Sequence, residues 1–140
     1  MLRVPFFAIV LACAGQIAAA DQFGPMLNDW REGRNLHALR ASPELARAAA
    51  AHAADMGRRG FFSHTGSDGS SASDRARRAG FRACALAENI AKGQAGPSGA
   101  LQGWVASRPH RRNMTHRRMT HYGYAEGPGR VHVLMLGAPC

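Results

Sequence analysis

The chain has 140 residues, of which 46% are hydrophobic and 19% are charged, a balance typical of a single compact domain. This composition excludes a disordered or collagenous chain, and no apolar run after residue 20 is long enough to span a membrane. The formal net charge of +9 admits anionic ligands and surfaces as partners.

Residues 1–20 have the pattern of an export signal. Arg3 precedes a short apolar run, and three alanines at positions 18–20 supply the small residues that a signal peptidase requires. The sequence therefore predicts a mature domain of residues 21–140 that is secreted or periplasmic. The alternatives are a buried core helix, disfavoured by the terminal position of the run, and lipid attachment at Cys13, which would leave an unusually short signal.

Removal of the signal leaves two cysteines, Cys84 and Cys140, in a chain that would fold in an oxidising compartment. The sequence predicts that they form a disulfide that joins the C-terminus to the middle of the chain. Two free thiols are the alternative. A cysteine-rich zinc cluster is excluded, because it needs more cysteines than the chain has.

Helices are expected in the first half of the chain. Apolar residues recur at helical spacing over residues 23–30. Ser42 and Pro43 are a typical cap and first-turn pair, and they predict an alanine-rich helix that ends near residues 57–60. The small side chains of that helix should allow another layer to pack closely against it. A loop rich in Gly and Ser then leads to a short helix over residues 74–79.

The second half mixes strands with short helices. A strand is expected within residues 81–91, a turn-rich connector over 93–99, and a helix around 101–105. Pro109 should open a further helical turn.

The chain is expected to end in a hairpin. Its strands are residues 119–125 and residues 131–136, joined by a turn over 126–129, and His132 is the polar residue of the second, buried strand. Helices followed by paired strands indicate an α+β fold.

Three polar residues are placed where chemistry can occur. His64 follows the end of a predicted helix, Glu88 lies in a predicted strand, and His110 opens a helical turn. Clefts form where elements end, so these side chains are candidates for one site. Taken singly, each signal is weak, because a lone histidine is more often an ordinary surface or core residue and a lone glutamate can simply cap a backbone group.

The short motifs around these residues are more specific than the residues themselves. In chain order they are Phe62-Ser63-His64, then Asp68-Gly69 and Arg75, then Glu88-Asn89-Ile90-Ala91, and finally Trp104 with Ser107, Pro109-His110-Arg111 and Asn113. This order, over about residues 28–136, resembles the CAP superfamily. That family includes cysteine-rich secretory proteins, insect antigen 5 and plant pathogenesis-related proteins, and the chain is most similar to its short bacterial SCP-like extracellular branch.

The resemblance implies an α-β-α sandwich with a small, mostly antiparallel central sheet. It also implies a cleft built around two histidines and two acids, in which His64, His110 and Glu88 match three of the four positions. The sequence departs from the family twice. Ala87 stands where the family motif has glycine, and the second acid is missing from the region of Ser107, so the acidic half of the cleft is incomplete.

Two arrangements of the cleft remain open. Two imidazoles and a carboxylate, from His64, His110 and Glu88, could hold Zn²⁺ or another divalent metal and leave a position for water or ligand. The same residues could form a hydrogen-bond network in which Glu88 orients a histidine and Asn89 satisfies nearby backbone groups. The missing acid favours the network, because it lowers the charge available to hold a cation.

The expected function is therefore that of an exported binding module for a lipid-like, cell-wall or other anionic ligand, or for a metal, with Ser107 as a further cleft residue. The alternative is a metal-dependent hydrolase or peptidase that uses the same cleft. No serine lies in a Gly-x-Ser-x-Gly motif, so nucleophilic catalysis has little support. The residues alone do not decide between a binding module and an enzyme.

Arginines occur in clusters along the chain, at residues 58–59, 75–78, 111–112 and 117–118. They could attract anionic lipids, cell-wall polymers or nucleic acid, but few aromatic residues accompany them as stacking platforms. The sequence favours a solvated arginine-rich surface on a monomer. Export also makes nucleic acid an unexpected partner.

Overall fold

The structure is a computed structural model that describes the backbone of residues 18–140 and the side chains from Gln22 onward. The predicted export signal therefore lies almost entirely outside the described residues. The elements in chain order are α1 (Ala18–Glu32), β1 (Arg40–Ala41), α2 (Pro43–Arg59), α3 (Ala72–Arg78), β2 (Ala83–Lys92), α4 (Gly96–Ala106), α5 (Arg108–Met114), β3 (His121–Gly127) and β4 (Val131–Pro139).

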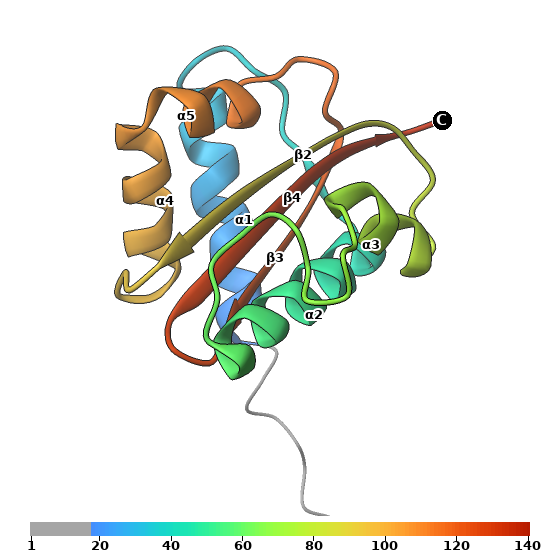
Figure 1. The fold of residues 1–140 in the computed structure, drawn as a ribbon. Helices are drawn as coiled ribbons and strands as arrows, with labels where there is room; N and C mark the ends of the chain where they lie inside the picture. Colours follow the sequence, from blue (N-terminus) through green and yellow to red (C-terminus); the bar gives the residue numbers. More distant parts are fainter. Residues whose placement is uncertain (1–17) are drawn as a thin grey trace, which may run out of the picture.

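These elements form three layers, in which one sheet lies between two layers of helices (Figure 1). The strand order is β1-β3-β4-β2, in which only the short β1 is parallel to its neighbour, β3. One hydrophobic core lies between the sheet and α1, α4 and α5, and a second lies between the sheet and α2 and α3. The expected α+β fold, an α-β-α sandwich with a mostly antiparallel sheet, is confirmed.

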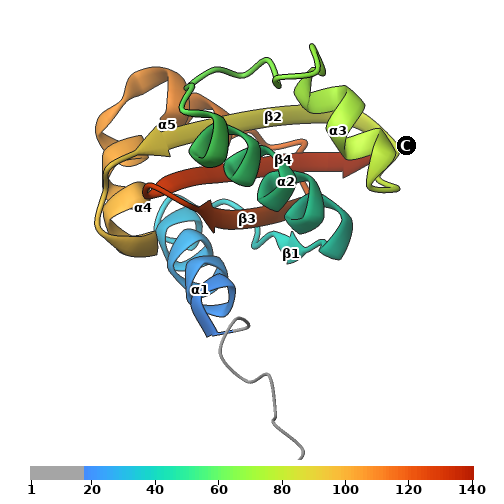
Figure 2. The same ribbon diagram turned by 60° about the horizontal axis from the view of Figure 1, so that its bottom comes forward.

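Helix α2 lies directly across one face of the sheet (Figure 2). As predicted, Ser42 caps its N-terminus by accepting a hydrogen bond from the Leu45 backbone, and Gly60 ends it in the left-handed conformation. The approach is so close that a Cβ atom at Gly123 of β3 would lie 2.2 Å from the Ala46 nitrogen. The expected close packing of the alanine-rich helix is thus confirmed, and it requires a glycine on the facing strand.

Several boundaries differ from the prediction. The expected connector over residues 93–99 is shorter, because α4 already begins at Gly96 and Pro97 occupies its first turn, where proline is favoured. Strand β4 continues beyond residue 136 to Pro139, since these residues pair with the start of β2. Strand β1 was not predicted, because two residues are too few to show an alternating pattern.

The predicted disulfide between Cys84 and Cys140 is present and spans 56 residues of sequence. It joins the start of β2 to the end of β4, with the two Cα atoms 4.7 Å apart. The backbone N–H of Cys140 also donates to the carbonyl of Arg82. The C-terminal end of the chain is therefore held at the edge of the sheet. Over residues 18–140, no helix has both the length and the apolar character needed to cross a bilayer.

Candidate functional site

The candidate site is organised around the carboxylate of Glu88, near the middle of β2. Its side chain is only 3% exposed, and it points toward the layer of α2 and α3. The Oε1 atom accepts a hydrogen bond from Nδ1 of His64 at 2.7 Å, and Oε2 accepts one from Nη2 of Arg75, also at 2.7 Å. Both oxygens are engaged, which is the condition for keeping a carboxylate charged in a buried position.

Arg75, from α3, is the cation that neutralises this carboxylate. Its side chain is 7% exposed, and it also donates to the backbone carbonyls of His64 and Ser70 at 3.0 and 2.9 Å. The prediction that the arginines of residues 75–78 form a solvated surface cluster is wrong for Arg75. The reason is that it lies on the side of α3 that faces the sheet, next to a buried acid.

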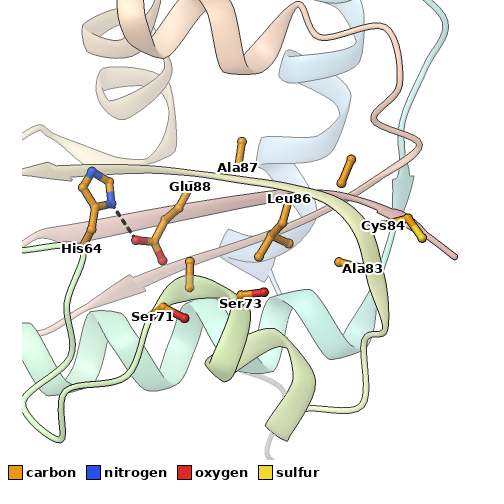
Figure 3. A pocket seen from close by; sticks show the side chains of 10 residues that line it. His64, Ser71, Ser73, Ala83, Cys84, Leu86, Ala87 and Glu88 are labelled. Atoms are coloured by element: carbon orange, nitrogen blue, oxygen red, sulfur yellow. Dashed lines mark hydrogen bonds and ion pairs between the residues drawn. The ribbon is translucent and has the colours of Figure 1, made fainter.

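His64 forms the exposed end of the network, and its side chain is 59% exposed (Figure 3). Its position is fixed twice, by Glu88 through the ring and by Arg75 through the backbone carbonyl. Because Nδ1 donates a hydrogen bond to the carboxylate, Nε2 is the ring nitrogen that has no partner within the described residues. The network therefore presents one oriented imidazole nitrogen.

His52 of α2 lies behind this pair and was not among the predicted site residues. It is fully buried, its Nε2 donates to the carbonyl of Ser63 at 2.8 Å, and the same nitrogen lies 3.9 Å from Oε1 of Glu88. Burial lowers the pKa of His52, while the charge of Glu88 opposes this and that of Arg75 adds to it. The sequence signal is a lone histidine on an otherwise apolar face of α2, and such a residue is usually part of the core.

His110 of α5 lies on the other side of β2 from the Glu88 carboxylate. Its Nδ1 is 2.7 Å from the hydroxyl of Ser107, the residue that caps α5. Burial lowers the pKa of His110, and the nearby imidazole of His64 lowers it further. The structure therefore brings the two predicted histidines close enough to interact electrostatically.

Asn89 explains how these two sides of the strand are joined. It is fully buried, donates to the backbone carbonyl of His110 at 3.2 Å, and accepts from the amide of Asn113 at 2.8 Å. Successive strand residues point to opposite faces, so Glu88 holds His64 on one face while Asn89 holds α5 on the other. His64 on one face and His110 on the other can approach each other around β2, because β2 is an edge strand.

The predicted metal ligands do not form a three-ligand set in this arrangement. Within residues 18–140, no three His, Cys, Asp or Glu side chains are grouped so that they could hold a metal ion. Each oxygen of Glu88 already accepts a hydrogen bond, one from His64 and the other from Arg75. The geometry favours the hydrogen-bond network.

A groove of about 530 Å³ runs from this network toward the disulfide. One wall is the strand from Ala83 to Glu88, and the other is formed by Ser71, Ala72 and Ser73 at the start of α3. His64 lies at one end (Figure 3). The oriented imidazole is therefore positioned against a hollow whose walls consist largely of small side chains, alanine and serine.

A sequence model of the cysteine-rich secretory protein family, CAP, matches residues 26–130. The chain belongs to the CAP family. A curated relative, the protein YkwD of Bacillus subtilis (strain 168), is 31% identical over 98 residues. That match covers 70% of this chain but 38% of the relative, so the chain spans less than half of the relative's length.

Solved structures agree with this CAP assignment. An extracellular protein containing an SCP domain from Bacillus anthracis has a TM-score of 0.81 at 27% identity, covering 86% of this chain and 40% of that protein. An outer surface protein from Borrelia burgdorferi gives 0.79 at 16% identity, covering 89% and 95%. A cysteine-rich secretory protein from Staphylococcus aureus gives 0.71 at 13% identity, covering 90% and 40%. The last two show that the CAP fold is shared.

The buried His52 and the half-buried His110 of this CAP domain provide a test by pH. We expect the free energy of unfolding to fall as the pH is lowered from about 7.5 to 5. In the unfolded chain an imidazole has a pKa of about 6.5, whereas burial lowers the pKa of His52 and His110 in the folded state. The unfolded chain then binds more protons, so stability that is present above this pH is lost below it. Urea unfolding at a series of pH values measures the effect.

The variant His52→Gln is the matched control for this experiment. Its amide can still donate to the Ser63 carbonyl, but it cannot titrate. We expect a flatter dependence of stability on pH for the variant than for the wild type. Identical slopes would show that His52 does not contribute.

Proposed function

We propose that this protein is an exported CAP-domain binding module whose groove beside β2 takes a ligand that contacts His64. The observation that carries the proposal is the engagement of both Glu88 oxygens, by His64 and Arg75. A carboxylate held in this way orients an imidazole. This role supports a binding module more than it supports metal ligation or general-base catalysis.

The location outside the cytoplasm is supported by the described relatives. The Bacillus anthracis protein is described as extracellular, and the Borrelia burgdorferi protein as an outer surface protein. The predicted signal over residues 1–20 and the disulfide between Cys84 and Cys140 favour the same compartment. The ligand is then a component of the cell envelope or its surroundings, either lipid-like or anionic, as the net charge of +9 favours.

A metal-dependent hydrolase is the second candidate, supported by the electrostatic effect of His64, which lowers the pKa of His110. A metal held by the two histidines would need Glu88 as its third ligand, and Glu88 is paired with Arg75. Of the two serines that line the groove, Ser71 and Ser73, the first already caps α3 through its hydrogen bonds with Asp74 and is not free to act as a nucleophile. The geometry therefore gives the hydrolase less support than the binding module.

Zinc titration separates these two functions. We expect calorimetry to show no stoichiometric zinc binding. Any weak zinc binding should be the same for the wild type and for Glu88→Gln. The substitution keeps the hydrogen-bonding capacity of residue 88 and removes its charge. One zinc bound per chain, lost in both Glu88→Gln and His64→Ala, would instead support the hydrolase.

Ligand binding itself is followed at the imidazole ring of His64 by NMR. We expect phosphatidylglycerol vesicles, a soluble anionic cell-wall polymer or a peptide to shift the ring signals of His64. His64→Ala assigns the signal, and His116→Ala, at an exposed histidine outside the groove, is the control variant. The binding-module proposal fails if none of the three probes moves this signal.

A further inference from the structure

Strand β2 forms one edge of the sheet, with β4 as its neighbour. The hydrogen bond from the N–H of Gly93 to the carbonyl of Arg130 shows which residues of β2 direct their main-chain groups toward β4. Main-chain groups alternate in direction along an antiparallel strand, so the odd-numbered residues 85–93 face β4. The main-chain groups of Leu86, Glu88 and Ile90 consequently face away from the sheet.

Side chains of the neighbouring helices cover only one end of this edge. Nε1 of Trp104 donates to the carbonyl of Ile90 at 3.1 Å, and the amide of Asn113 approaches the carbonyl of Glu88 at 3.5 Å. No hydrogen bond from elsewhere in residues 18–140 reaches the main-chain groups of Leu86. The edge is therefore capped at residues 88–90 and open at Leu86.

The groove follows the open part of the edge. Its strand wall consists of the consecutive residues 83–88. Because successive side chains point to opposite faces of a sheet, a hollow that touches all of them lies along the edge of the strand. Figure 3 shows Leu86 and Glu88 turned toward α3, and Ala87 turned away.

The end of the groove away from His64 carries basic side chains. A second hollow of about 230 Å³ shares Ser73 and Ala83 with the groove, and adds Arg77 and Arg82 to its lining. Arg77 pairs with Asp74, whereas the exposed side chain of Arg82 has no partner within the described residues. The carboxylate in the groove, Glu88, is already neutralised. Two arginine side chains, Arg77 and Arg82, therefore line this end, together with the C-terminal residue Cys140.

We propose that the open edge of β2 binds an extended peptide, which adds to the sheet as a further strand and places an acidic group at Arg82. This inference rests on the proposed binding function and names the ligand class. Main-chain hydrogen bonds at Leu86 supply affinity, and Arg82 selects the acidic end. At about 3.3 Å per residue, the span from residue 82 to residue 88 accommodates about six peptide residues. An acyl chain would leave the main-chain groups of Leu86 unpaired.

The test uses the mature chain and a fluorescein-labelled hexapeptide of alternating valine and threonine that ends in two glutamates. We expect saturable binding by fluorescence anisotropy. Arg82→Glu should weaken it by about fivefold or more, whereas Arg117→Glu, at an exposed arginine outside the groove, should leave it nearly unchanged. A peptide that ends in two lysines should instead bind more tightly to Arg82→Glu than to the wild type. Ser73→Trp, at an exposed position in the groove wall, should abolish binding.

The same hexapeptide with alternate amides N-methylated is the backbone control. It keeps every side chain and loses the donors that pair with a strand edge, so we expect no binding. Equal binding of the two peptides would overturn the proposal, as would equal weakening by Arg82→Glu and Arg117→Glu. Absence of saturable binding up to about 1 mM would overturn it as well. If vesicles or cell-wall polymer still shift the His64 signal in that case, the binding module stands and only the peptide is excluded.

Discussion

Replacement of Arg75 by methionine should lower the free energy of unfolding by about 3–5 kcal/mol. Methionine fills a similar volume, but it leaves the buried carboxylate of Glu88 without its cation and removes the donors to the carbonyls of Ser70 and His64. An unpaired charge in a buried position is among the most costly defects that a fold can contain. Urea unfolding monitored by circular dichroism measures the loss.

Two further variants show whether the loss comes from the buried charge. Arg77→Met changes the same helix at a side chain that is 77% exposed, so we expect a change below about 1 kcal/mol. The double variant Arg75→Met/Glu88→Gln removes the charge together with its partner and should recover part of the stability. A loss for Arg75→Met no larger than that for Arg77→Met would contradict the assigned role.

Removal of the disulfide should have a comparable effect. Replacing Cys84 and Cys140 by alanine releases a loop of 56 residues in the unfolded chain, and the chain-entropy model gives a loss of about 4 kcal/mol. The melting temperature, measured by calorimetry, should fall in the double variant. The single variant Cys140→Ser should lower it too.

The reduced wild-type protein is the control for these substitutions. Its melting temperature should match that of the double variant, and intact mass after alkylation should show two modified thiols only when a reductant is present. Two alkylatable thiols in protein isolated under oxidising conditions would contradict the pairing. An unchanged melting temperature would contradict the energetic argument.

The sequence predicted those parts of the fold that depend on local signals. Ser42 and Pro43 mark the start of α2 because a cap and a first-turn proline act within one helical turn. The α5 turn opened by Pro109 was predicted for the same reason. The strand within residues 81–91 was predicted because its apolar run is long enough, and it corresponds to β2.

The sequence did not predict how charge is distributed at the site. An arginine in a cluster is usually on the surface, and although Arg75 belongs to a family motif, no local pattern shows that it is buried while Arg77 is exposed. Their difference arises only when α3 packs against β2 and one of the two faces Glu88. His52 was missed for a related reason, since its closeness to Glu88 depends on a contact between α2 and a strand 36 residues later.

The candidate residues themselves came from short motifs, and the structure adds the order in which they act on one another. His64 is held by Glu88, and Glu88 is held by Arg75. The second histidine, His110, is held by Ser107, at the position where the second acid of the family pattern is missing. The two halves of the cleft are therefore built differently, one on a buried charge and the other on a hydroxyl group.

Strand β4 follows every other element in the described part of the chain, yet it lies between β3 and β2. As the chain is made from its N-terminus, β2 has no neighbouring strand to pair with until β4 has been synthesised. Sheet formation therefore waits for the last residues, which close contacts over long stretches of sequence. An emerging chain has no complete sheet until β4 is made, and a chain that is exported, as proposed above, would still be open when it enters a translocation channel.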